Sequence, residues 1–286
     1  MDGEGPPNPP YRDGPIGLLD SGVGGLSILR ALRQELPGEP LLYVADQAHL
    51  PYGPRPLVEI RAFAKGITRF LLARGAKIVV VACNAASAAS LHHLRETFPH
   101  IPFVGMEPAV KPASEATQSG VIGVLTTAAT AAGPLYASVL ARFASGKHVE
   151  TVVCPELVDA VEDGQTDLAA LRPILDRALA PLLAAGADHI VLGCTHFPLA
   201  GDAIRAYVGS RARVVDPSPA IARQTHRVLA ERDLLHNGPA AQTLFYTTGD
   251  PLRFSQSLRL LLGETATAAR LAWSGEDLWP SGGRAE

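Results

Sequence analysis

Short apolar runs alternate with longer stretches of helical periodicity along most of this 286-residue chain. Apolar runs bounded by turn residues are typical of strands that helices bury on both faces, so the alternation predicts an α/β fold with mostly parallel sheets. We expect strands at residues 16–20, 41–45, 77–83, 121–125, 150–154, 189–193, 213–216 and 243–248. The expected helices include residues 26–36, 57–74, 87–98, 168–185 and 219–234.

The pattern contains an internal repeat. A Leu-Leu-Ala-x-Gly-Ala segment precedes the expected strand that ends at Cys83, and the same segment precedes the strand that ends at Cys194, at the same spacing. The Ile-Gly-x-Leu stretch after Pro15 also resembles the Ile-Gly-Val-Leu stretch that begins at Ile122. We therefore expect two similar, pseudo-duplicated α/β domains, one at 14–110 resumed at 215–270 and one at 111–214, with loose tails at 1–13 and 271–286.

Duplicated parallel sheets place a ligand site in the cleft between the domains, because ligands bind beyond the carboxyl ends of parallel strands. Cys83 and Cys194 both lie at such ends. Asn84 is well suited to cap a helix beginning at Ala85, and a thiol at a helix amino terminus has its thiolate favoured. A single cysteine in this position is also compatible with an inert core thiol, and we assign Cys154, which has no counterpart, to the core.

Two thiols on opposite sides of a carbon atom can invert it, since one thiolate removes a proton while the other thiol delivers one to the opposite face. One thiol must be charged and the other neutral, so neighbouring groups must tune them. Asp20, Glu162 and His196 are the candidates for this tuning. This chemistry predicts an acid–base enzyme.

A glycine-rich turn at 20–25, Asp-Ser-Gly-Val-Gly-Gly, permits two other interpretations. Its G-x-G-G spacing departs from the dinucleotide fingerprint G-x-G-x-x-G, although Asp46 lies near the position of the acid that binds ribose, so nicotinamide binding stays open. A short carboxylate-binding loop is the other interpretation. In the Pro-Tyr-Gly turn, Tyr52 could donate a hydrogen bond and Gly53 could let backbone approach a ligand, or the turn could be purely structural.

Composition excludes several classes. With 25 basic and 28 acidic residues there is no positive excess, so we expect no nucleic-acid binding. Three cysteines form no disulfide framework, and no Walker A, H-E-x-x-H or paired C-x-x-C motif occurs, so we expect no metal. The chain shows neither a signal-like amino terminus nor an 18-residue apolar run. We expect a soluble cytoplasmic protein that does not enter a membrane.

Several motifs together resemble the glutamate racemase family, within the aspartate/glutamate racemase superfamily. They are D-S-G-V-G-G-L-S at 20–27, P-Y-G at 51–53, E-P at 107–108, C-P-x-x-V-x-x-V-E at 154–162, G-C-T-H-F-P-L at 193–199 and F-Y-T-T-G-D at 245–250. The resemblance covers nearly the whole chain. It implies racemisation of glutamate without a cofactor, which supplies D-glutamate for peptidoglycan, by a protein that forms homodimers.

The resemblance also implies roles for individual residues. Cys194 would deprotonate L-glutamate, assisted by Glu162 and His196, and Cys83 would deprotonate the D enantiomer, assisted by Asp20. Polar contacts to the substrate would come from a set that combines both domains: Asp20, Ser21, Tyr52, Gly53, Asn84, Ala85, Thr127, Thr195 and His196. These assignments are predictions of the resemblance.

The chain departs from the family at two of these positions. Ala85 replaces a threonine whose hydroxyl would meet the substrate α-carboxylate, and losing one hydrogen bond to a charged group costs about 1.5–3 kcal/mol, roughly ten- to a hundredfold in binding. Thr126 replaces a glycine beside Thr127. We expect weaker affinity or a broader substrate range.

Alternatives remain to the activity that the resemblance implies. A pyridoxal-phosphate racemase would need a Schiff-base lysine, but none of Lys65, Lys77, Lys111 and Lys147 falls on the repeated strand ends, so a cofactor-free mechanism is favoured. A racemase of another or broader set of amino acids and a non-catalytic amino-acid-binding relative both stay open. A decarboxylase of the superfamily usually keeps only the second cysteine, so Cys83 argues against it.

Overall fold

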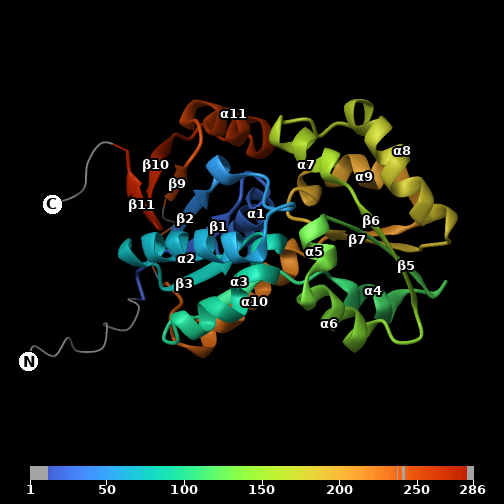
Figure 1. The fold of residues 1–286 in the computed structure, drawn as a ribbon, viewed down its shortest axis with the longest axis horizontal. Helices are drawn as coiled ribbons and strands as arrows, with labels where there is room; N and C mark the ends of the chain where they lie inside the picture. The colour runs from blue at the N-terminus through green and yellow to red at the C-terminus, as the bar shows by residue number, and fades with distance from the viewer. Residues whose placement is uncertain (1–11, 237, 240–241, 282–286) are drawn as a thin grey trace, which may run out of the picture.

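A computed structural model describes residues 12–236, 238–239 and 242–281 of the chain. Two sheets lie side by side in it, and helices cover both faces of each (Figure 1). The fold is therefore α/β with mostly parallel sheets, as the sequence predicts. Of the loose amino-terminal tail that we expect at 1–13, residues 1–11 lie outside the described residues.

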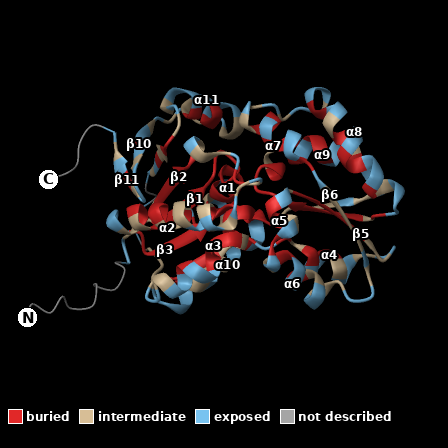
Figure 2. Ribbon diagram, in the orientation of Figure 1, coloured by how far each residue is buried: buried red, intermediate tan, exposed pale blue. Residues whose placement is uncertain are grey.

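The larger sheet has seven strands in the order β11-β10-β9-β2-β1-β3-β4, and all neighbours run parallel except β10 and β11. The strands are β1 (Ile16–Asp20), β2 (Leu41–Ala45), β3 (Ile78–Val81), β4 (Phe103–Gly105), β9 (Thr243–Thr247), β10 (Ala268–Ser274) and β11 (Asp277–Pro280). Its three central strands, β1 to β3, are buried at every residue (Figure 2). Burial on both faces explains why these segments are continuous apolar runs.

The smaller sheet has four parallel strands in the order β6-β5-β7-β8. They are β5 (Val121–Thr126), β6 (His148–Val153), β7 (His189–Gly193) and β8 (Arg213–Val215). This order matches β2-β1-β3-β4 of the larger sheet strand for strand, so the internal repeat in the sequence is a repeat of topology. The match makes β3, before Cys83, equivalent to β7, before Cys194.

Helices separate onto the two faces of each sheet. Beside the larger sheet, α1 (Leu26–Glu35), α10 (Ser218–Glu231) and α11 (Pro251–Leu262) pack together, and α2 (Leu57–Ala73) packs on α3 (Asn84–Thr97). Beside the smaller sheet, α7 (Pro155–Glu162), α8 (Leu168–Ala184) and α9 (Gly201–Val208) lie opposite α4 (Val110–Ala116), α5 (Ala128–Ala132) and α6 (Pro134–Phe143) (Figure 1). Short 3-10 turns are η1 (Gln47–His49), η2 (Phe197–Ala200) and η3 (Gly209–Arg211). None of the helices in the described part of the chain combines the length and apolar character needed to cross a bilayer.

The two halves share a hydrophobic core. One buried cluster joins residues of β1 and α1, such as Leu18 and Leu29, to residues of α8 and α9, such as Leu179 and Ile204. Phe197, in the turn after Cys194, belongs to the same cluster and is fully buried. We propose that the domains divide near residues 110 and 215, where the chain passes between the sheets.

The structure corrects two sequence expectations. The carboxyl-terminal tail is not loose from residue 271, because β10 and β11 form a hairpin that buries Leu271 and Leu278 and turns at Gly275, whose φ of 62° suits glycine. Helix α3 begins at Asn84 rather than Ala85, and its N-cap is Cys83, whose sulfur accepts the Ala86 N–H. The sulfur thus takes the capping position that the sequence assigned to Asn84.

Candidate active site

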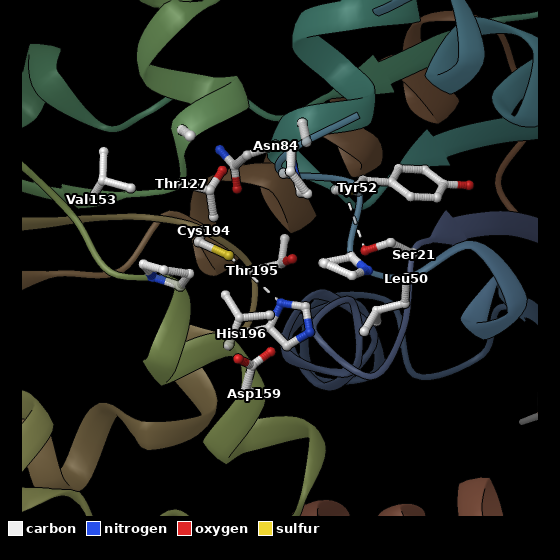
Figure 3. A pocket seen from close by; sticks show the side chains of 18 residues that line it. Ser21, Leu50, Tyr52, Asn84, Thr127, Val153, Asp159, Cys194, Thr195 and His196 are labelled. Atoms are coloured by element: carbon white, nitrogen blue, oxygen red, sulfur yellow. Dashed lines mark hydrogen bonds between the residues drawn. The ribbon is translucent and has the colours of Figure 1, made fainter. Parts of the chain in front are cut away.

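A pocket of about 260 Å³ lies where the carboxyl ends of the two sheets face each other (Figure 3). The loops after β1, β2 and β3 line it from the larger sheet, and those after β5, β6 and β7 line it from the smaller one. Its lining residues are Ser21, Leu50, Pro51, Tyr52, Gly53, Pro54, Cys83, Asn84, Ala85, Thr127, Ala128, Val153, Pro155, Val158, Asp159, Cys194, Thr195 and His196. Both repeated cysteines therefore reach one cavity, from opposite halves.

Cys83 lies in apolar surroundings at the amino terminus of α3. Its side chain is 5% exposed, and its sulfur accepts the Ala86 N–H at 3.5 Å and donates to Ser21 Oγ at 3.8 Å. Burial, and next the charge of Asp20, raise the pKa of the Cys83 thiol despite the helix-end hydrogen bond. The expectation that the helix terminus favours the thiolate does not hold at Cys83, because desolvation is the stronger effect.

Asp20 lies behind Cys83, at the end of β1, and does not line the pocket. Its Oδ2 accepts the N–H groups of Gly22 and Gly25 at 3.0 Å, while its buried Oδ1 hydrogen-bonds to no described residue. Burial raises the pKa of this carboxyl, although His196 and the two N–H groups oppose the shift. The charge of Asp20 raises the pKa of Cys83, and no hydrogen bond joins the two side chains among the described residues.

Cys194 carries different partners. Its sulfur lies 3.6 Å from Nδ1 of His196 (Figure 3). Nε2 of that ring lies 2.7 Å from Oε1 of Glu162. Burial by itself lowers the pKa of His196, but the hydrogen bonds to Cys194 and Glu162 outweigh it and hold that pKa well above its usual value. Burial likewise opposes ionisation of Glu162, yet the His196 hydrogen bond leaves the pKa of Glu162 below its usual value. An imidazolium–carboxylate pair therefore stands beside Cys194.

The glycine-rich turn binds carboxylates of the protein itself. Two of its N–H groups bind Asp20, and the Val23 N–H donates to Glu162 at 2.7 Å. A Cβ at Gly22 would lie 2.0 Å from Glu162 Oε1, and one at Gly24 would lie 2.5 Å from His196 Nδ1. Glycine is needed there because the second half of the molecule packs directly on this turn. These N–H groups bind Asp20 and Glu162, so they are free neither for a dinucleotide nor for the carboxylate of a ligand.

Most of the expected substrate contacts reach the pocket. Ser21, Asn84, Ala85, Thr127, Thr195 and His196 all line it. Asn84 is 3% exposed, and neither its Oδ1 nor its Nδ2 hydrogen-bonds to a described residue. A buried, unpartnered amide costs free energy unless a ligand meets it, so Asn84 is the clearest candidate for a polar ligand contact.

Tyr52 and Gly53 differ from expectation in detail. The Tyr52 hydroxyl donates to Asp46 at 2.6 Å and points away from the other labelled groups in Figure 3, so it is not available to a ligand. The Asp46 carboxylate also accepts hydrogen bonds from Thr248, Trp273 and His49 at 2.8–2.9 Å, and it is fully buried. It is therefore not available to bind the ribose of a dinucleotide. A Cβ atom at Gly53 would make only an ordinary van der Waals contact, 3.7 Å from the Cβ atom of Thr127.

Several lining residues were not found from the sequence. Val158 and Asp159 line the pocket from α7, about one helical turn before Glu162. Helical spacing back from Glu162 could have indicated them. Leu50 and Val153 carry no such signal, because apolar residues are common both in loops and at the ends of strands.

The remaining cysteine and the lysines lie elsewhere. Cys154 caps α7 within the core, and burial raises its pKa to about 11. All four lysines fall among the described residues, and none lines the pocket. Lys77 is buried against Glu39 at 2.6 Å, and Lys111 is exposed beside Glu115. The described residues contain no group of three or more His, Cys, Asp or Glu side chains placed to hold a metal ion.

The fold and the pocket define a class: a two-domain α/β protein whose pseudo-duplicated halves each contribute a thiol to one shared ligand site. Residues 18–225 match the model of the family described as Asp/Glu/Hydantoin racemase. The chain belongs to this racemase family and is thus an isomerase.

Individual members agree with this assignment. The chain is 50% identical to a glutamate racemase of Roseiflexus sp. (strain RS-1) over 249 residues, which cover 86% of this chain and 92% of that protein. The crystal structure of glutamate racemase isoform RacE1 from Bacillus anthracis matches with a TM-score of 0.83 at 30% identity and covers 93% of this chain and 100% of that one. Glutamate racemase from Francisella tularensis subsp. tularensis SCHU S4 in complex with D-glutamate matches at 27% identity with a TM-score of 0.79, covering 93% of this chain and 99% of that one.

Proposed function

We propose that the protein is a glutamate racemase that interconverts L- and D-glutamate by proton transfer at Cα between two cysteines, without an organic cofactor. The observation that carries the proposal is the meeting of Cys83 and Cys194, from equivalent strand ends, in one pocket. The glutamate racemases to which the chain is similar support the substrate. In this role the protein supplies D-glutamate for peptidoglycan.

The charges beside the thiols assign the first step. The His196 imidazolium, held by Glu162, stabilises a thiolate at Cys194, whereas Cys83 stays a neutral thiol in its apolar setting. The Cys194 thiolate takes the α-proton of L-glutamate, and the Cys83 thiol gives its proton to the opposite face of the carbanion. Cys194 is then a thiol and Cys83 a thiolate, which is the arrangement needed for D-glutamate.

Apart from the His196 imidazolium, which we assign to Cys194, neutral groups hold the substrate. None of the described residues that line the pocket is a lysine or an arginine. The carboxylates of the substrate therefore depend on hydroxyl, amide and backbone N–H donors. We assign this role to Ser21, Asn84, Thr127 and Thr195 together with the N–H groups of Gly53 and Ala85. Ala85 contributes no hydroxyl, and Thr126 is occupied in a hydrogen bond to the Gly193 carbonyl at 3.0 Å, so neither side chain supplies the missing contact.

The placement of the lysines supports the cofactor-free mechanism. Lys77, the most buried of them, is paired with Glu39 at the opposite end of its sheet from the pocket. A Schiff base in the pocket would need a lysine that reaches it. The homodimer and the cytoplasmic location implied by the family stay predictions.

Racemisation of glutamate with no added cofactor tests the proposal. We expect circular dichroism of L-glutamate to decay to zero with the purified protein, and solvent deuterium to enter Cα. A panel of L-amino acids followed by chiral chromatography separates a glutamate racemase from a racemase of another amino acid, an alternative that Ala85 and the acidic Asp159 in the pocket wall favour. Saturable binding without deuterium incorporation would instead identify a non-catalytic binding protein.

A further inference from the structure

A chain of hydrogen bonds crosses the boundary between the two sheets and ends at Cys194. It begins at Thr247, the last residue of β9, whose hydroxyl donates to Gln47 Oε1 at 2.8 Å. Gln47 Nε2 then donates to Glu162 Oε2 at 3.3 Å. Glu162 Oε1 holds His196, which in turn contacts the Cys194 sulfur. The larger sheet thus reaches the thiol of the smaller one.

The direction of the bonds is fixed by chemistry. Thr247 Oγ1 accepts the Gly249 N–H at 3.0 Å, so its own proton is free to go to Gln47 Oε1. The amide of Gln47 must then present its NH₂ group to Glu162, which as a carboxylate can only accept. The orientation of Gln47 therefore follows from its partners on both sides.

Gln47 is an uncharged hydrogen-bond donor to Glu162, and its lack of charge has a specific consequence. Glu162 Oε1 already accepts from both Val23 and His196 at 2.7 Å, so Gln47 is the side-chain partner of the second oxygen. It fixes the plane of the carboxylate without neutralising it. A lysine there would compete with His196 for the charge of Glu162 and weaken the imidazolium beside Cys194.

We infer that Gln47 and Thr247 are positioning residues for the Cys194 half of the reaction, acting through Glu162 and His196 from the opposite domain. This inference rests on the proposed two-thiol racemisation. Neither η1 nor β9 carries a thiol, but through Gln47 and Thr247 they hold Glu162 in place when the two halves are together.

Rates alone cannot test the inference. Because L- and D-glutamate are equally stable in water, kcat/KM must fall by the same factor in both directions whichever thiol is impaired. The deuterium isotope effect separates them, since Cys194 takes the deuteron from L-[2-²H]glutamate and Cys83 takes it from the D isomer. Slower transfer at Cys194 makes that step more rate-limiting in both directions.

The test compares Gln47→Met, which keeps the shape and removes both hydrogen bonds, with the wild type. We expect kcat/KM to fall about threefold to tenfold, as one hydrogen bond to a charged group is lost. The isotope effect on kcat/KM should rise with deuterated L-glutamate and fall towards unity with deuterated D-glutamate. Thr247→Val should move both isotope effects in the same directions by a smaller amount.

Gln256→Met is the matched control, because Gln256 is an exposed glutamine on α11. It should change neither rate nor isotope effects. A Gln47→Met enzyme whose two isotope effects equal those of the wild type would overturn the inference, even with a lower rate, because a merely structural loss reduces active enzyme without moving them. A wild-type protein that does not racemise glutamate would instead remove the proposed function and this inference with it.

Discussion

Cys83 and Cys194 end equivalent strands of two sheets with the same strand order, yet their neighbours differ in charge. Cys83 contacts Ser21 and the start of α3, with the Asp20 carboxyl behind it. Cys194 contacts His196, which is paired with Glu162. The two thiols are placed symmetrically, but burial and Asp20 raise the pKa of Cys83, whereas Cys194 faces the His196–Glu162 pair.

The difference matters to the proposed mechanism because it needs one thiol charged and the other protonated at the same time. Two thiolates have no proton to give, and two thiols take none. An acidic neighbour on one side and a cationic one on the other separate the protonation states at a single pH. Five substitutions follow, in order of decreasing expected effect.

Removing either thiol should give the largest effect. Cys83→Ala and Cys194→Ala should each lower racemisation by about a thousandfold, because a general acid or base is lost. In D₂O the Cys83→Ala protein should still exchange the α-proton of L-glutamate, and the Cys194→Ala protein that of D-glutamate. Proton NMR measures both exchanges. Cys154→Ala, which changes a core thiol, is the control; parental rates in both active-site variants would refute the mechanism.

Neutralising Glu162 should slow the proton transfer at Cys194. Glu162→Gln should lower kcat about a hundredfold with L-glutamate, since a short buried bond to a charged group is weakened. Without the carboxylate the pKa of His196 falls, so the alkaline limb of the pH profile should move to lower pH. Glu156→Gln, on the exposed side of the same helix, should leave the profile unchanged.

The same pair contributes to stability over a defined pH range. The pKa of His196 is raised on folding, so its contribution is complete below the usual histidine pKa and is lost as pH rises through the raised value. The pKa of Glu162 is lowered, so its contribution is present above the usual glutamate pKa and is lost as pH falls through the lowered value. Thermal unfolding of Glu162→Gln should therefore differ most from wild type between these limits.

On the Cys83 side, replacing Asp20 should lower activity without lowering stability. Asp20→Asn should lower kcat about thirtyfold, because the charge that opposes the Cys83 thiolate is lost. The pKa of Asp20 is raised by burial, so the ionised carboxyl destabilises the fold at pH values above that pKa. The melting temperature of Asp20→Asn at pH 8 should thus equal or exceed that of wild type. A clear loss of stability would assign Asp20 a structural role instead.

The smallest expected effect is on the affinity for substrate, which bears on both thiols equally. Ala85→Thr should lower KM for glutamate about tenfold, because it adds a hydroxyl at a lining position whose side chain offers no hydrogen bond. Ala85→Val adds the same shape without the hydroxyl and should not lower KM. If Thr and Val behave alike, the α-carboxylate is bound elsewhere.

The central strands of both sheets could be predicted closely. β1, β2 and β7 begin and end where their apolar runs do, since burial on both faces leaves a continuous signal. β4 and the β10–β11 hairpin were missed, because β4 is short and β10, although paired on both sides, buries only Leu271 and so lacks a continuous apolar run. The start of α3 was one residue off because sulfur rather than amide caps it.

In the candidate site, the sequence supplied the chemical groups but not their orientations. Repetition indicated Cys83 and Cys194 together, and both line the pocket. The Tyr52 hydroxyl is turned towards Asp46, and only the arrangement of η1, β9 and β10 around that carboxylate explains why. Gln47 gave no signal because its role depends on Glu162, which is far away in the chain.

The sequence by itself determined the α/β class, the duplication and the two reactive strand ends, because each depends on local periodicity and spacing. The tertiary structure alone decided which thiol is neutral and which faces a cation. Those properties depend on burial and on charges brought from other segments, such as Asp20 behind Cys83 and Glu162 beside His196. Electrostatic energies vary with distance and desolvation in space, and neither is written in the order of residues.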